Sequence, residues 1–122
     1  MKHNFNRVAL THNLYHSVSP GLQTSTRRLE WCVHKVPFVA EELLVHRGAN
    51  IQIEENYLAR IHDLVTEVYV MTAVLSRASR SLTLGLDNFE LEATIAVTLS
   101  HESKYLFPFY LNLFNSSSAG KE

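Results

Sequence analysis

The middle third of this chain contains an apolar repeat that strongly limits the folds available to it. Nine apolar residues recur at steps of three or four positions: Ile53, Tyr57, Ile61, Leu64, Val68, Met71, Leu75, Ala78 and Leu82. Such steps place every member on one side of an α-helix, and charged residues such as Arg60, Asp63 and Glu67 fall on the other side. The pattern predicts one amphipathic helix of about eight turns, ended by Gly85 at its C-cap.

A weaker repeat precedes this helix. One face is predicted to carry Leu29, Val33, Val36, Ala40, Leu43 and Arg47, with Thr24 or Ser25 as the N-terminal cap. Pro37 interrupts the repeat, and an interior proline removes a backbone hydrogen bond and clashes with the preceding turn. We therefore expect a kink at Pro37 or a helix that restarts after Val36.

A third helix is predicted to start near Asp87 or Asn88, because both residue types favour the N-cap position. Its predicted buried face carries Leu91, Ile95, Leu99, Glu102 and Leu106. Pro108 is expected to end or bend this helix.

The breaks around Gly48 and Gly85 are short, which favours antiparallel packing of neighbouring helices. The predicted fold is therefore all-α, an up-and-down bundle of three long helices, and 122 residues suffice for one such domain. Residues 20–114 are assigned to the helical domain. Residues 1–19 are interpreted as a leader, poorly ordered or weakly similar to a transit peptide, and residues 115–122 as a disordered tail.

Composition excludes several classes of function. The net charge of −1 gives no electrostatic basis for binding nucleic acid. No stretch approaches the roughly 20 apolar residues that a membrane span requires. The single cysteine, Cys32, cannot form an internal disulfide and is interpreted as a packing residue beside Trp31.

Residues that would carry catalysis are not found in a recognisable pattern. His12 and His16 are four positions apart, but no third metal ligand follows at a suitable spacing. The four glycines are isolated, so no phosphate-binding loop or dinucleotide fingerprint is present, and no serine elbow occurs. We predict no catalytic, cofactor-binding or metal residues, and therefore no enzymatic activity for this chain as it stands.

Two groups of residues are candidates for contacts with a partner. Arg77 and Arg80 lie off the predicted apolar stripe, where they are available for an ion pair or simply suit the C-terminal end of the helix dipole. Residues 105–114 contain five aromatic side chains and no charge; Tyr105, Phe107, Phe109 and Tyr110 are the candidates singled out here. Such a run either docks a partner or membrane surface, or closes the bundle, and the sequence leaves both alternatives open.

One block of the sequence carries a resemblance to a known family. It reads Tyr69-Val70-Met71-Thr72-Ala73-Val74-Leu75-Ser76-Arg77-Ala78-Ser79-Arg80-Ser81. The block is similar to the C-terminal domain of acyl-CoA dehydrogenase family member 9 and of very-long-chain acyl-CoA dehydrogenase. Residues 82–88 and 43–48 continue the resemblance, which covers roughly residues 20–107; Pro37 departs from the family pattern. The resemblance implies a helical fold.

The resemblance also implies what the chain lacks. In that family the FAD site and the catalytic glutamate belong to the N-terminal dehydrogenase part, so no such residue carries over to this chain. The expected function is a non-catalytic interaction domain. The expected partners are the rest of an acyl-CoA dehydrogenase, its dimer mate, complex I assembly factors or the inner-membrane surface, on the matrix side of mitochondria. The alternative is the terminal fragment of a full FAD-dependent acyl-CoA dehydrogenase of fatty acid beta-oxidation.

Overall fold

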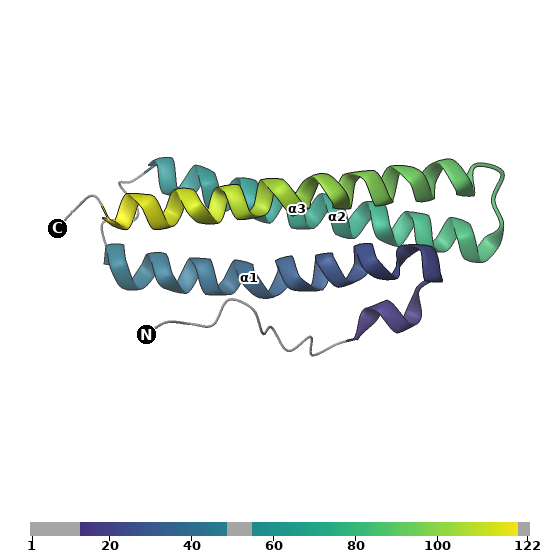
Figure 1. The fold of residues 1–122 in the computed structure, drawn as a ribbon, viewed down its shortest axis with the longest axis horizontal. Helices are drawn as coiled ribbons and strands as arrows, with labels where there is room; N and C mark the ends of the chain where they lie inside the picture. The colour runs from purple at the N-terminus through teal and green to yellow at the C-terminus, as the bar shows by residue number, and fades with distance from the viewer. Residues whose placement is uncertain (1–12, 49–54, 120–122) are drawn as a thin grey trace.

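The structure, a computed structural model, describes residues 13–48 and 55–119. Two short 3-10 turns, η1 (Leu14–Ser17) and η2 (Pro20–Leu22), precede three helices: α1 (Gln23–Arg47), α2 (Glu55–Leu84) and α3 (Phe89–Ala119). The helices lie side by side, and each runs antiparallel to the next (Figure 1). Within the described ranges there is no strand. The predicted all-α, up-and-down bundle of three long helices is confirmed.

Helix α2 follows its sequence pattern closely. The buried members of its apolar stripe are Tyr57, Leu64, Met71, Leu75 and Ala78, while Ile61, Val68 and Leu82 are partly buried against the same core. Ile53, the first residue of the predicted stripe, lies outside the described residues. The described part of the stripe is thus covered by the other helices, both of which contact α2.

The turn after α2 depends on a glycine, as predicted. Gly85 has a φ of +63°, a conformation that a residue with a Cβ adopts only at a cost in free energy. The amide of Leu86 donates a hydrogen bond of 3.2 Å to the carbonyl of Ser81, five residues back. This is the bond of a Schellman motif, and it ends α2 where the sequence places the end.

Helix α1 differs from the prediction at its N-terminal cap and in having no restart after Val36. Its first residue is Gln23, because the η2 turn leads directly into it, and neither Thr24 nor Ser25 caps it. Pro37 lies inside the helix, which continues to Arg47 without a restart after Val36. The proline is on an exposed part of the helix, where water can bind the carbonyl that loses its partner.

The buried face of α1 is also displaced from the predicted one. Leu29 is buried, but Val33 is exposed, and Cys32 and Val39 occupy the core in its place. Helix α1 packs against both α2 and α3, so the side that is directed between them is buried. The side chains of Leu43 and Arg47 are not among those described.

The ends of the chain differ in part from the predicted boundaries. Helix α3 passes through Pro108 and continues to Ala119, so Pro108 does not end it, and residues 115–119 are helical where a disordered tail was expected. In the expected leader, Leu14–Ser17 form η1. Residues 1–12 lie outside the described part of the chain.

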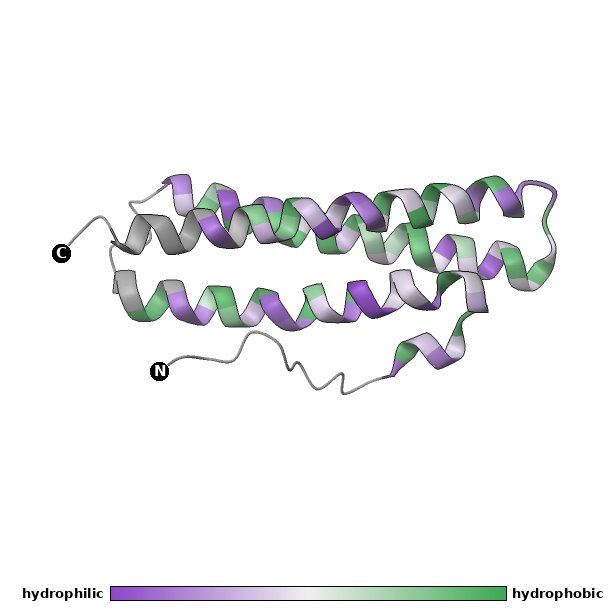
Figure 2. Cartoon of the chain, in the orientation of Figure 1, coloured by the Kyte–Doolittle hydropathy of each residue, from purple (hydrophilic) through white to green (hydrophobic). Residues whose placement is uncertain are grey.

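The largest departure from the sequence prediction concerns the buried face of α3. Leu91 is 61% exposed, Ile95 is 52% exposed, and Leu106 is exposed as well. The buried positions of α3 are instead Ala96, Ser100, Ser103 and Phe107. Hydrophobic residues accordingly occur on exposed sides of the helices as well as in the core, and they recur along each helix in Figure 2.

Small side chains on both α2 and α3 explain this choice of face. Ala78 and Ser81 of α2 are fully buried, and Ala96 and Ser100 of α3 are almost fully buried. Small residues allow two helix backbones to approach closely, which maximises dispersion contacts along the seam. Hydrogen bonds also cross between the helices, among them those from Ser81 to Glu92 and from Ser103 to Glu67. We call this contact the α2–α3 seam.

Candidate interaction surface

The aromatic run near the end of α3 is divided between the core and the surface. Phe107 is 0% exposed and packs edge-on against Trp31 of α1, with 5.6 Å between ring centroids and 68° between ring planes. An edge-to-face pair of this kind adds to the free energy gained from burial. Phe107 therefore closes the bundle.

Two other aromatic side chains of the run are exposed to solvent. Tyr105 is 62% exposed and Phe109 is 58% exposed, so both are accessible to a partner. The ring of Tyr105 lies 5.4 Å from that of His101, and the Lys104 ammonium lies 5.9 Å from the Tyr105 ring. The side chain of Tyr110 is outside the described part of the structure.

Of the two candidate arginines, Arg77 has a partner inside the bundle. Its Nη2 lies 3.3 Å from Oε1 of Glu92 on α3, and its Nε lies 3.3 Å from Oε2. Ser81 donates a hydrogen bond to the same carboxylate. The Ser81 hydroxyl, followed by the Arg77 guanidinium, lowers the pKa of Glu92 below its ordinary value of 4.5. Arg77 thus helps to hold the α2–α3 seam, and a role in docking stays a prediction.

This carboxylate gives the bundle a predictable sensitivity to acid. A carboxylate whose pKa is lower in the folded chain stabilises the fold fully above its unfolded pKa, and this contribution is lost as the pH falls through the folded pKa. We therefore expect the difference in urea midpoint between the wild type and Glu92→Gln to be largest near pH 7 and to shrink below about pH 4.5. Urea titrations followed by circular dichroism from pH 7 to 3 measure it.

Glu90→Gln is the matched control for this experiment, because Glu90 is an exposed carboxylate in the same turn of α3. Its urea midpoint at pH 7 should differ from that of the wild type by less than the midpoint of Glu92→Gln does. A difference between wild type and Glu92→Gln that does not change with pH would contradict the role assigned to this carboxylate.

Arg80, the second candidate arginine, is exposed on α2. It lies three residues beyond Arg77 and close to the C-terminal end of the helix, where a positive charge interacts favourably with the helix dipole. Its position is compatible with a partner contact.

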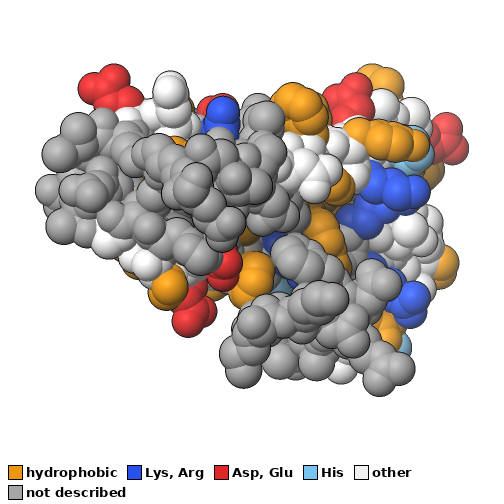
Figure 3. All heavy atoms as spheres, turned by 60° about the vertical axis from the view of Figure 1, so that its left-hand side comes forward, with side chains coloured by type: hydrophobic (Ala, Val, Ile, Leu, Met, Phe, Trp, Pro, Cys, Tyr) orange, Lys and Arg blue, Asp and Glu red, His pale blue; other side chains and the backbone are white. Residues whose placement is uncertain are grey.

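A larger exposed feature includes Leu91, Ile95 and Leu106, which were expected in the core, together with Phe109 of the aromatic run. Leu91, Ile95, Leu106 and Phe109 are all exposed, and their spacing places them on one side of α3. We call these four residues the outer α3 face. The competing pattern of small residues at positions 96, 100 and 103, ending at Phe107, was the signal that could have identified the buried side. Exposed hydrophobic side chains also reach the surface in the view of Figure 3.

Cys32 has the structural role predicted for it. Its side chain is buried, and burial, with a smaller contribution from the charge of Glu67, raises the thiol pKa to about 12. The reactive form of cysteine is the thiolate, so this thiol is a poor nucleophile near neutral pH. Cys32 acts as a small apolar residue of the core.

Among the described residues there is neither a metal-binding cluster nor a helix that could span a membrane. Within residues 13–48 and 55–119, no three His, Cys, Asp or Glu side chains gather as a metal-binding group would. Over the same ranges, no helix has both the length and the apolar character needed to cross a bilayer. His12 lies outside these ranges, and His16 is exposed in η1.

The sequence of this chain matches a known protein family. A family model described as "ACAD9/ACADV, C-terminal domain" matches residues 20–121. The match includes η2 and all three helices, and so covers well over half of the chain. It confirms the resemblance seen in the sequence block around residues 69–81. The chain belongs to the ACAD9/ACADV C-terminal domain family.

Proposed function

We propose that this chain is a non-catalytic docking domain that binds the dehydrogenase part of an acyl-CoA dehydrogenase through its outer α3 face. The observation that carries the proposal is the exposure of Leu91, Ile95, Leu106 and Phe109 on one side of one helix. Exposed apolar side chains gathered on one side of a helix are typical of protein interaction sites, since burying them against a partner releases water. Family membership supports the choice of partner.

The absence of a cofactor site in this chain is part of the same proposal. The glycines of the described residues, Gly21, Gly48 and Gly85, lie far apart in the sequence at separate turns or helix ends. A dinucleotide such as FAD needs several closely spaced backbone amides around its phosphates. The proposal therefore assigns any flavin chemistry to the partner and not to this chain.

Binding to a purified dehydrogenase part from a family member, measured by isothermal titration calorimetry, tests the proposal. The variant Leu91→Lys/Ile95→Lys should bind at least tenfold more weakly, because two charges would have to be desolvated in the interface. The control Val33→Lys/Leu44→Lys changes two exposed apolar residues of α1 in the same way and should bind like the wild type. Equal affinity of both double variants, or no binding by the wild type, would reject this role.

The proposal has three finer parts: the cellular location, the additional partners and a second candidate role. Family membership supports a mitochondrial location on the matrix side of the inner membrane, and complex I assembly factors are additional partners for the same calorimetric assay. Exposed Tyr105, with the Lys104 ammonium beside its ring, and exposed Phe109 favour a membrane-surface role as a second candidate. Flotation with cardiolipin-containing liposomes would detect it, and a chain that remains at the bottom of the gradient would reject it.

The alternative is that the native polypeptide is a full FAD-dependent acyl-CoA dehydrogenase of fatty acid beta-oxidation, of which this sequence is the terminal part. An antibody against residues 23–44 distinguishes the two proposals. A band near 13.9 kDa supports the separate domain. A band several times larger supports the full enzyme.

A further inference from the structure

A cavity of about 440 Å³ lies between α1 and α3, on a different side of the bundle from the outer α3 face. Trp31, Cys32 and Pro108 contribute to its apolar walls, and Arg27, Arg28 and Lys104 also line it. Its volume falls within the range of about 300–1,000 Å³ that is usual for small-molecule sites. None of these residues has a part in the docking surface proposed above.

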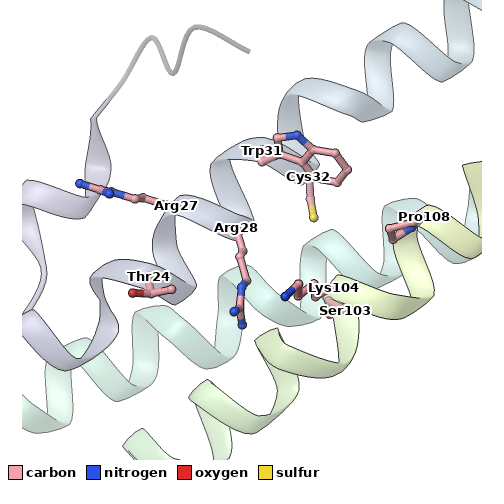
Figure 4. A pocket seen from close by; sticks show the side chains of 8 residues that line it. All are labelled: Thr24, Arg27, Arg28, Trp31, Cys32, Ser103, Lys104 and Pro108. Atoms are coloured by element: carbon pink, nitrogen blue, oxygen red, sulfur yellow. The ribbon is translucent and has the colours of Figure 1, made fainter. Parts of the chain in front are cut away.

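The positive charges around this cavity come from both helices. Figure 4 shows the Arg28 side chain extending from α1 toward α3, where Lys104 is located. Arg27 extends the other way, and its guanidinium lies 4.1 Å from the centre of the Tyr15 ring. Arg28 and Lys104 are therefore the two cations placed to receive an anionic group.

A negative charge lies on the inner side of the same cavity. Ser103, another residue of the lining, donates a hydrogen bond to Glu67 of α2, and the charge of Glu67 contributes to the raised pKa of Cys32. An anion would be repelled from this inner side and attracted to Arg28 and Lys104. The electrostatics thus fix the orientation of a ligand with one charged end and one apolar end.

We propose that this cavity binds an amphipathic anion, with a carboxylate or phosphate group between Arg28 and Lys104 and an apolar tail against Trp31 and Pro108. Charge-assisted hydrogen bonds from a guanidinium and an ammonium are among the stronger polar contacts in proteins. The apolar tail gains free energy from leaving water. The anionic group or the apolar tail alone would bind weakly. A ligand that carries both would bind more tightly, and this requirement defines the ligand class.

Trp31 is the only tryptophan of the chain, so its fluorescence reports on the cavity directly. The full 122-residue chain would be titrated with decanoate and with decyl phosphate, each below its micelle concentration. Decyl maltoside provides the same tail without charge, and inorganic phosphate provides the charge without a tail. We expect a saturable change in emission with at least one of the two amphipathic anions, and binding at least tenfold weaker for both controls.

Variants locate the site. Arg28→Gln and Lys104→Gln should each weaken binding of the amphipathic anion at least fivefold, while circular dichroism shows an unchanged helix content. Arg60→Gln is the matched control, because it removes the same charge from α2, and its affinity should equal that of the wild type. Binding of decyl maltoside as tight as that of decanoate, equal effects of all three substitutions, or no saturable binding of either anion would overturn the proposal.

Discussion

Replacing Phe107 with alanine is expected to lower the free energy of unfolding by about 3–5 kcal/mol, the usual cost of removing a large aromatic side chain from a core. Phe107 is fully buried, and its ring packs edge-on against Trp31 of α1. The substitution removes apolar surface from the core, leaves a cavity and abolishes the contact between two aromatic rings. Small domains have free energies of unfolding of about 5–15 kcal/mol, so this loss would be a large fraction of the total stability.

Chemical denaturation followed by circular dichroism measures the effect. Phe109→Ala is the matched control, since Phe109 lies two residues away in the same helix but is 58% exposed. Its free energy of unfolding should change by no more than about 0.5–1 kcal/mol, as is usual for surface substitutions. If the two variants lost the same stability, the division of the aromatic run into a core residue and surface residues would be wrong.

The second large effect is expected at the α2–α3 seam. Ala96→Leu should destabilise the chain by about 1–3 kcal/mol, because added methylene groups in a well-packed contact force backbones or rotamers to shift. Ala96 is 1% exposed. On a helix that buried Leu91 and Ile95 instead, position 96 would face outward, and the same substitution would be neutral or slightly stabilising because leucine is a strong helix former.

The seam prediction therefore distinguishes the two possible orientations of α3. Ala73→Leu in α2 is the control, since Ala73 is exposed and the change in side chain is identical. Thermal and urea denaturation of both variants should show a loss of stability for Ala96→Leu alone. A stable Ala96→Leu variant would indicate that α3 buries the face that carries Leu91 and Ile95.

These two predictions also bear on function. The outer α3 face is available for docking only because the small residues of α3 are buried against α2. A result that reversed the orientation of α3 would remove Leu91 and Ile95 from the surface and the docking proposal with them. The proposed anion site depends on the same orientation, because Ser103, Lys104 and Pro108 of α3 line it, and also on the contact of Trp31 with Phe107.

Much of the fold could be predicted from local pattern. The apolar stripe of α2, the turn at Gly85 and the start of α3 after Asn88 agree with the structure. A helix with a single continuous stripe has one side that it can bury, and a glycine with positive φ ends it at a definite residue. The family resemblance rested on residues in this same region.

Local pattern did not predict the buried side of a helix correctly where two sides of that helix could be buried. In α3 the residues Leu91, Ile95 and Leu106 form a more hydrophobic side than Ala96, Ser100 and Ser103, and a count of apolar residues favours the wrong one. Neither a restart after Val36 nor a helix end at Pro108 is found, because Pro37 is exposed and Pro108 is only partly buried, positions where an interrupted hydrogen bond costs less.

The sequence by itself determined that this chain forms three helices, where the turn at Gly85 falls and which side of α2 is buried. Only the tertiary structure decided which side of α3 and which side of α1 enter the core, and hence which residues remain for a partner. The physical reason is that close packing depends on the shapes of two facing surfaces together. Ala78 and Ser81 leave room for Ala96 and Ser100, a match that the residues of either helix alone do not reveal.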